Sequence, residues 1–191
     1  MLSGPIEEQA RAKVNLALHV TGRRADGYHL LESIVAFADL CDHLTFAPAR
    51  FNSLRIGGPQ SAGLDARDNL VLRAHAAMAR AFGARIPNIA VELDKHIPVA
   101  AGLGGGSADA AATLRALSRL AGLDHKSREI HEVALSLGAD VPVCLGSRAC
   151  RMHGIGDGLE PLGALGPLPV VLANAGPALA TAKVFAALGL A

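Results

Sequence analysis

Four glycines fall within five residues of the segment PVAAGLGGGSA, which spans Pro98 to Ala108. Glycine lacks a Cβ atom, so such a segment can adopt positive φ angles and let its backbone N–H groups converge on a ligand. A following helix adds unpaired N–H groups and the positive end of its dipole, which favour an anion. The segment therefore predicts a phosphate-binding loop, with a flexible or close-packed turn as the alternative.

The spacing of these glycines excludes two common nucleotide-binding loops. A Walker A loop ends in Gly-Lys-Ser/Thr, whereas Ser107 stands where its second glycine is required and no lysine follows. The dinucleotide-binding fingerprint requires a glycine at that same position. The segment instead resembles the Pro-x-x-x-Gly-Leu-Gly-small-small-Ala loop of the GHMP small-molecule kinases.

Charged residues elsewhere in the chain are candidates to act with this loop. Lys13 and Asn15 share one face of an alternating segment, where they either line a site or lie on a solvated strand surface. Asp140 either caps a short helix or presents its carboxylate from the start of that helix. Asp109 lies in the first turn of the expected helix after the loop, where it either favours the helix dipole or helps to hold a phosphate-bound magnesium ion.

Hydrophobic periodicity and turn residues predict the elements that position these groups. Strands are expected at 6–20, 30–38, 42–48, 53–56, 89–95, 148–153 and 168–173, and helices at 69–82, 107–121, 126–137 and 181–188. Asp68 and Ser107 are the expected N-caps of the first two helices. In the first strand, the face that carries Leu16 and Leu18, with Val14 and Val20, is expected to form the core.

The composition is that of a globular chain with one core. Of 191 residues, 51% are hydrophobic and 18% charged, and the formal net charge is only +1, which disfavours both disorder and an electrostatic nucleic-acid surface. The N-terminus has no apolar signal-peptide region, and glycines and prolines interrupt the apolar stretch at 163–180, so neither secretion nor a membrane span is expected. Cys41, Cys144 and Cys150 lack CxxC spacing and are interpreted as reduced packing residues of a cytoplasmic protein rather than metal ligands.

Five motifs in order resemble the GHMP kinases, and among them the branch that acts on 4-diphosphocytidyl-2-C-methyl-D-erythritol. They are AKVNLAL at 12–18, GYH at 27–29, DNL at 68–70, PVAAGLGGGSADAA at 98–111 and GADVPV at 138–143. The resemblance implies an α+β fold of the ribosomal protein S5 domain 2-like type, with a mixed, mainly antiparallel sheet and helices on one side. It also implies an N-terminal ATP-binding and catalytic domain at 1–175, and at 176–191 the start of a connection to a second domain.

The resemblance assigns roles to individual residues. Lys13 and Asp140 would be the catalytic pair, with Asp140 as the general base, and no resident metal site is implied. The expected ATP-binding residues are Asn69, Leu70, Pro98, Val99, Ala100, Ala101, Gly102, Leu103, Gly104, Gly105, Gly106, Ser107 and Ala108. The expected substrate-binding residues are Asn15, Tyr28, His29, Thr181 and Phe185. Tyr28 and Phe185 would enclose the cytosine ring, although a tyrosine at a strand start also commonly closes the edge of a hydrophobic face.

The implied reaction transfers a phosphoryl group from ATP, with Mg²⁺, to the 2-hydroxyl of the cytidine-diphosphate-linked erythritol, in non-mevalonate isoprenoid precursor synthesis. The alternatives are a nucleotide-binding module without turnover and another GHMP small-molecule kinase. Neither nucleic acid nor membrane is an expected partner. Members of the family continue into a second domain that this sequence does not contain, so an exposed apolar surface and self-association are expected.

Overall fold

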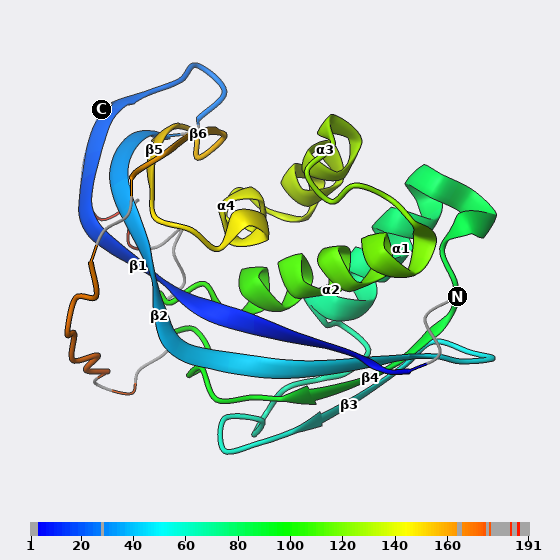
Figure 1. The fold of residues 1–191 in the computed structure, drawn as a ribbon. Coiled ribbons are helices and arrows are strands. Elements are labelled where there is room, and N and C mark those ends of the chain that lie inside the picture. The colour runs from blue at the N-terminus through cyan, green and yellow to red at the C-terminus, as the bar shows by residue number, and fades with distance from the viewer. Residues whose placement is uncertain are drawn as a thin grey trace.

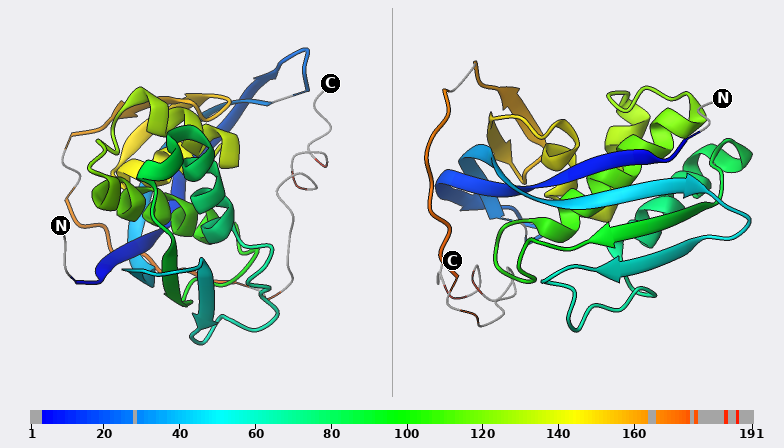
Figure 2. Two further views of the ribbon diagram at one scale, coloured as in Figure 1. Left: turned by 90° about the vertical axis from the view of Figure 1, so that its right-hand side faces the viewer. Right: turned by 60° about the horizontal axis from the view of Figure 1, so that its bottom comes forward.

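The structure is a computed structural model that describes residues 4–27, 29–163, 166–174, 176, 184 and 187. Its elements form two layers, a mixed sheet and a group of helices that covers one face of it (Figure 1). The views in Figure 2 place all the helices on the same side of the sheet. The α+β architecture with helices on one side is therefore as predicted.

Six strands form the sheet, and β2 lies at its centre. The strands are β1 (Ile6–Arg23), β2 (His29–Pro48), β3 (Ser53–Gly57), β4 (Ile89–Asp94), β5 (Cys150–Gly154) and β6 (Gly158–Pro161). β1 pairs with β2 along most of its length, while the two halves of β2 pair with β4 and with β5. The order is β3-β4-β2-β5-β6, with only β3 and β4 parallel. The sheet is thus mainly antiparallel, as expected.

The prediction of separate strands at 30–38 and 42–48 was wrong. Both belong to β2, which continues through a register shift at 38–40 and pairs with β1 on either side of it. The expected core face of β1 was also wrong, since Leu16 and Leu18 are 42% and 43% exposed while Lys13 is buried. Burial along β1 ends after Lys13, where register shifts interrupt the pairing and the strand pair bends away from the helices (Figure 1).

The helices are arranged around α2, which packs against β1, α1 and α4. They are α1 (Leu70–Phe82), α2 (Gly105–Ala121), α3 (Arg128–Leu137) and α4 (Val141–Gly146), with a short 3-10 turn at Gly83–Arg85. The alanines of α2 let it lie close to the sheet, while Leu114 and Leu117 fill the core between them. α2 therefore carries the segment after the glycine loop directly into the centre of the molecule.

Two helix starts differ from the predictions. Asn69, not Asp68, caps α1, because its Oδ1 accepts a hydrogen bond from the N–H of Val71 at 3.0 Å. α2 begins at Gly105 rather than at Ser107, with Gly104 as its N-cap at φ 67°. A glycine in the left-handed region brings the chain into the helix there without any capping side chain.

The last predicted elements are only partly tested. The segment 168–173 has no regular secondary structure, in contrast to the predicted strand, because its backbone joins no neighbouring strand. Apart from Val184 and Ala187, the predicted helix at 181–188 lies outside the described residues, as does the rest of the predicted connection at 176–191 except Gly176.

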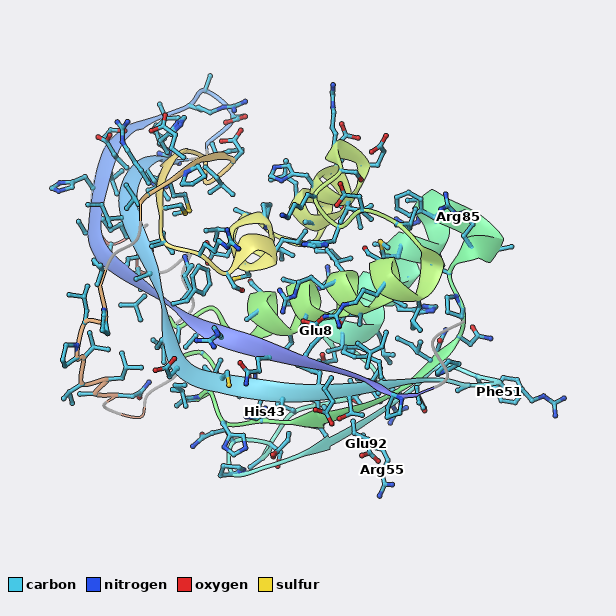
Figure 3. The ribbon with its side chains drawn as sticks, in the orientation of Figure 1. Glu8, His43, Phe51, Arg55, Arg85 and Glu92 are labelled. Carbon is cyan, nitrogen blue, oxygen red and sulfur yellow. The ribbon has the colours of Figure 1, made fainter. Side chains whose placement is uncertain are left out.

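The two faces of the sheet differ in polarity. Glu8 lies on the helix-covered side of β1, where it accepts a hydrogen bond from Arg115 Nε of α2 at 2.8 Å, whereas His43, Arg55 and Glu92 extend from the opposite side (Figure 3). This is the pattern of an antiparallel sheet with one solvated face. No helix within the described ranges is long and apolar enough to cross a membrane.

The three cysteines are free and buried, as predicted for packing residues. Burial raises the pKa of the Cys144 thiol to about 12, and the negative charge of Asp140 adds to the effect. A thiol with so high a pKa stays protonated at neutral pH and is a poor nucleophile or metal ligand.

Candidate active site

The glycine loop has a backbone suited to binding an anion. Positive φ angles occur at every second residue, at Ala100 (54°), Gly102 (74°) and Gly104 (67°). Alternation between right- and left-handed backbone conformations directs successive N–H groups toward one concavity. The N-terminus of α2 follows at once and contributes its own unpaired N–H groups. The loop backbone is therefore suited to an anion, and phosphate binding there stays a prediction.

The loop is joined to Lys13 of β1 through both backbone and side chain. The N–H of Lys13 donates a hydrogen bond to the carbonyl oxygen of Leu103 at 2.8 Å. A Cβ atom at position 104 would lie 3.3 Å from Lys13 Cβ, so glycine allows the closest approach of the loop to the strand. The position of the Lys13 side chain and the path of the loop are consequently fixed together.

Lys13 and Asp140 meet although 127 positions separate them in sequence. Lys13 Nζ lies 2.9 Å from Asp140 Oδ1, and the side chains are 5% and 42% exposed, respectively. Asp140 is the residue before α4, whose first turn contains Pro142. Asp140 makes no side-chain capping bond to α4, so its carboxylate is directed to the lysine and the open surface instead.

A cavity of about 370 Å³ brings together the glycine loop, the start of α1 and Asp140. Of the predicted ATP-binding residues, those that border it are Asn69, Leu70, Pro98, Val99, Ala100, Ala101, Gly102, Leu103, Gly104, Gly105, Gly106 and Ser107. Ala108 is buried beneath them. Lys95 and Asp109 also border the cavity, although sequence reasoning gave Lys95 no role.

Asp109 lies beyond the first turn of α2, so its predicted role as a partner of the helix dipole is wrong. It is buried one turn into α2, and its Oδ2 lies 2.7 Å from Lys95 Nζ. Lys95 also contacts the carboxylate of Asp42 on β2, so three charged side chains meet under the loop. Burial raises the pKa of Asp109 to about 7, against the opposing positive charge of Lys95. The group is an internal ion cluster, and the predicted role of Asp109 toward a phosphate-bound magnesium ion stays a prediction.

Alternation along the strands contains a signal for this cluster. Lys95 follows Ile89, Val91 and Leu93 at two-residue spacing, and all four side chains are buried. Asp42 stands in the same relation to the buried residues Leu44 and Phe46 on β2. A charged side chain on a buried strand face requires a partner of opposite charge. Lys95, at the end of β4, and Asp42 of β2 are such partners for each other.

The predicted substrate-binding residues are less closely gathered. Asn15 is exposed, and its Oδ1 lies 3.2 Å from Ser33 Oγ of β2. His29 pairs with Arg23 at the far end of the β1–β2 pair, about 30 Å along the strand from Lys13. Tyr28, Thr181 and Phe185 lie outside the described residues.

The sequence model described as "GHMP kinases N terminal domain" matches residues 69–148, which include the glycine loop and Asp140. A 4-diphosphocytidyl-2-C-methyl-D-erythritol kinase from Bradyrhizobium sp. (strain ORS 278) is 53% identical over 193 aligned positions, which cover 99% of this chain. The chain contains a GHMP kinase N-terminal domain.

Further comparisons agree with a GHMP kinase N-terminal domain. A 4-diphosphocytidyl-2-C-methyl-D-erythritol kinase from Cereibacter sphaeroides is 56% identical and covers 95% of the chain. A crystal structure of 4-(cytidine 5'-diphospho)-2C-methyl-D-erythritol kinase superimposes with a TM-score of 0.67 at 42% identity, covering 82% of this chain and 55% of that one. The mevalonate kinase of Methanococcus jannaschii, at 14% identity and a TM-score of 0.60, shares the fold. This chain spans about 63% of the length of the two curated relatives.

Proposed function

We propose that this chain transfers the γ-phosphoryl group of ATP to the 2-hydroxyl of 4-diphosphocytidyl-2-C-methyl-D-erythritol. The products would be the 2-phosphate and ADP, in cytoplasmic synthesis of isoprenoid precursors by the non-mevalonate route. The observation that carries the proposal is the Lys13–Asp140 pair, in which Lys13 Nζ and Asp140 Oδ1 lie 2.9 Å apart and the aspartate borders the cavity beside the glycine loop. The 53% identity to a kinase named for this substrate supports the choice of acceptor.

The nucleotide would occupy the cavity with its phosphates on the loop. Backbone N–H groups from 100–106 and the N-terminus of α2 can donate to phosphate oxygens, while Asn69 and Leu70 lie on the side where the adenosine would bind. Among the described residues, no group of three or more acidic, histidine or cysteine side chains is arranged to hold a metal ion. Mg²⁺ would arrive with ATP, because such an ion is bound largely by phosphate oxygens and water.

Phosphoryl transfer depends mainly on positioning and on positive charge near the phosphoryl oxygens. Lys13 contributes a buried ammonium group beside the loop, and Mg²⁺ would add charge on the phosphates. Because Lys13 contacts Oδ1 of Asp140, the half-exposed carboxylate can turn its Oδ2 toward an acceptor hydroxyl and receive its proton. Lys13 would thereby orient the base and stabilise the charge that develops during transfer.

The acceptor would extend from Asp140 along the bent β1–β2 pair. Asn15 lies two residues beyond Lys13 in that direction, and His29 marks the far end of the pair. We propose that His29, with Tyr28, Thr181 and Phe185, recognises the cytidine end, with the two aromatic rings stacked on the base.

A nucleotide-binding module without turnover is the second candidate function. The observation that favours it is that the cavity gathers nearly all the predicted ATP-binding residues, while neither Asn15 nor His29, the two acceptor-binding candidates that the structure describes, borders it. Against it stands the ion pair of Lys13 and Asp140, because binding nucleotide alone requires no general base.

The test is to incubate the chain with ATP and Mg²⁺, with and without 4-diphosphocytidyl-2-C-methyl-D-erythritol, and to measure ADP. The proposal predicts ADP formation that depends on the acceptor and falls when the cytidine moiety is removed from it. Saturable ATP binding without acceptor-dependent ADP would instead identify the nucleotide-binding module.

A further inference from the structure

Lys95, Asp42 and Asp109, which we call the Lys95 cluster, lie directly beneath the glycine loop. Their side chains are 4%, 0% and 3% exposed, respectively. Lys95 Nζ donates hydrogen bonds to Oδ2 of Asp42 and to Oδ2 of Asp109, the latter at 2.7 Å. The cluster connects the end of β4, the middle of β2 and the first turns of α2, so it joins both layers of the domain.

Asp42 fixes the chain where it enters the loop. Its Oδ1 accepts hydrogen bonds from the N–H of His96 at 2.6 Å and from the N–H of Ile97 at 2.8 Å. These are the last two residues before the loop begins at Pro98. One carboxylate therefore binds both the Lys95 side chain and the backbone leading away from it.

Asp109 fixes the chain where it leaves the loop. It lies four residues after Gly105, the first residue of α2, and its bond to Lys95 holds the helix start over the cluster. A Cβ atom at position 105 would lie 3.1 Å from Lys95 Nζ and 3.0 Å from Ile97 Cγ2. The glycine allows the helix terminus to lie directly on the lysine.

Both ends of the loop are thus attached to a single ammonium group. The loop itself has three residues with positive φ, including the non-glycine Ala100, and such a backbone persists only where its surroundings hold it. Within the described part of the chain, Asp109 Oδ1 is buried without a hydrogen-bond partner, which leaves the cluster with an unused acceptor beside the cavity that Asp109 borders.

We propose that Lys95 is a positioning residue that, through Asp42 and Asp109, holds the glycine loop in its phosphate-binding conformation. Its effect on nucleotide binding rests on the proposed function, whereas its effect on the loop of the free protein does not. The proposal therefore predicts a change in the loop that can be measured without any ligand.

The test compares Lys95→Met with Arg115→Met in the full chain. Arg115 is the matched control because it also connects α2 to the sheet through a buried carboxylate, donating from Nε to Glu8 at 2.8 Å, but lies ten positions after Gly105. Amide hydrogen exchange of His96, Ile97 and Ala108, whose N–H groups make hydrogen bonds at the two ends of the loop, is measured first in the free protein. We expect Lys95→Met to speed exchange there by about tenfold or more, and Arg115→Met to leave it close to wild type.

The second measurement is the Kd for Mg·ATP together with the steady-state constants. Lys95→Met should raise the Kd and the KM for ATP by about tenfold while kcat changes much less, because binding geometry is lost and the Lys13–Asp140 pair is kept. If Lys95→Met does not fold, as its thermal transition would show, Asp109→Asn carries the same predictions with the side-chain volume kept.

Unchanged loop exchange in the folded Lys95 or Asp109 variant would overturn the proposal, and so would an equal increase in Arg115→Met. A wild-type chain that binds no ATP would refute the proposed function, yet the exchange measurement would still decide the role of Lys95.

Discussion

Lys13 connects the loop and the base of the candidate site at the level of a single residue. Lys13→Met keeps the packing against Gly104 but removes the charge next to Asp140. We expect kcat to fall by at least about 100-fold, because a cation beside the transferring group stabilises the transition state more than the bound nucleotide. The measurement is steady-state ADP formation, together with the Kd for Mg·ATP, which should change by less than about threefold.

Arg11→Met provides the control for this variant. Arg11 lies two residues earlier on β1 and pairs with exposed Asp39 at 2.9 Å, away from the cavity. Near-normal turnover in Lys13→Met, or an equal loss in Arg11→Met, would remove Lys13 from the mechanism.

The second prediction at the residue scale concerns the protonation of the Asp109 carboxyl group. Burial raises the pKa of Asp109 from 3.8 to about 7, with Asp42 adding to the rise and Lys95 opposing it. Between these values the folded state keeps a proton that the unfolded chain has lost. The contribution of Asp109 to the free energy of unfolding is therefore complete below about pH 4 and is lost as the pH rises through about 7. The free energy of unfolding falls by at most about 1.4 kcal/mol per pH unit in this range.

Urea unfolding of wild type and Asp109→Asn at pH 5 and pH 8 checks this sign. The wild type should lose more unfolding free energy than the variant between the two pH values, because asparagine does not titrate. Other titrating groups contribute equally to both proteins and cancel in the comparison. Parallel pH dependence in the two proteins would contradict the assignment.

The start of α1 supplies a prediction at the level of elements. Because Asn69 Oδ1 accepts from the N–H of Val71, Asn69→Ala should lower the unfolding free energy by about 1 kcal/mol. Asp68→Ala, at the position that sequence reasoning favoured, should change it by less than about 0.5 kcal/mol. Both are measured by urea unfolding without nucleotide. A larger loss in Asp68→Ala than in Asn69→Ala would mean that the cap is Asp68 after all.

The elements also show what the sequence can and cannot predict. Local periodicity predicted most of the strands and helices. The observed helix starts differ from the predicted ones where a glycine or a neighbouring residue forms the N-cap. The core face of β1 could not be predicted, because Leu16 and Leu18 alternate as core residues do but lie on a part of the strand that the helices do not cover. Alternation records which residues share a face, whereas tertiary packing decides which face is buried.

The candidate site also contains residues that the sequence predicted and residues that it did not. Lys13 and Asp140 were found through motifs that resemble a family, since no spacing rule relates residues so far apart in sequence. Lys95 and Asp42 were overlooked although alternation places them on buried faces, because each looks like an ordinary polar strand end when its own strand is considered alone. Their meaning depends on the pairing of β2 with β4, which local sequence does not specify.

The molecule as a whole presents apolar surface next to the site. Leu16 and Leu18 are exposed on β1, and the segment 166–172 beside Leu16 exposes Leu168 and Val171 at 56% and 94%. We propose that residues 1–175 form the catalytic domain, that 176–191 begin a connection to a second domain, and that this surface would adjoin that domain. The chain should therefore self-associate as its concentration rises.

Sedimentation or light scattering across a concentration series tests this expectation. Leu16→Lys combined with Leu18→Lys should shift the chain toward monomer, since charged side chains would oppose contact between apolar surfaces. Phe51→Ser is the control, because Phe51 is 70% exposed but lies at the opposite end of the sheet (Figure 3). A wild-type chain that remains monomeric at all concentrations would contradict the prediction.

The most direct test of the account is a single-turnover transfer with the chain in excess over γ-labelled ATP, with Mg²⁺ and the cytidyl-erythritol acceptor. The wild type is predicted to move the label to the acceptor, and Asp140→Asn to do so at least about 100-fold more slowly while still binding ATP. A wild-type chain that binds ATP but transfers no label, or an Asp140→Asn chain that transfers it at the wild-type rate, would contradict the claim that Lys13 and Asp140 form a working kinase site.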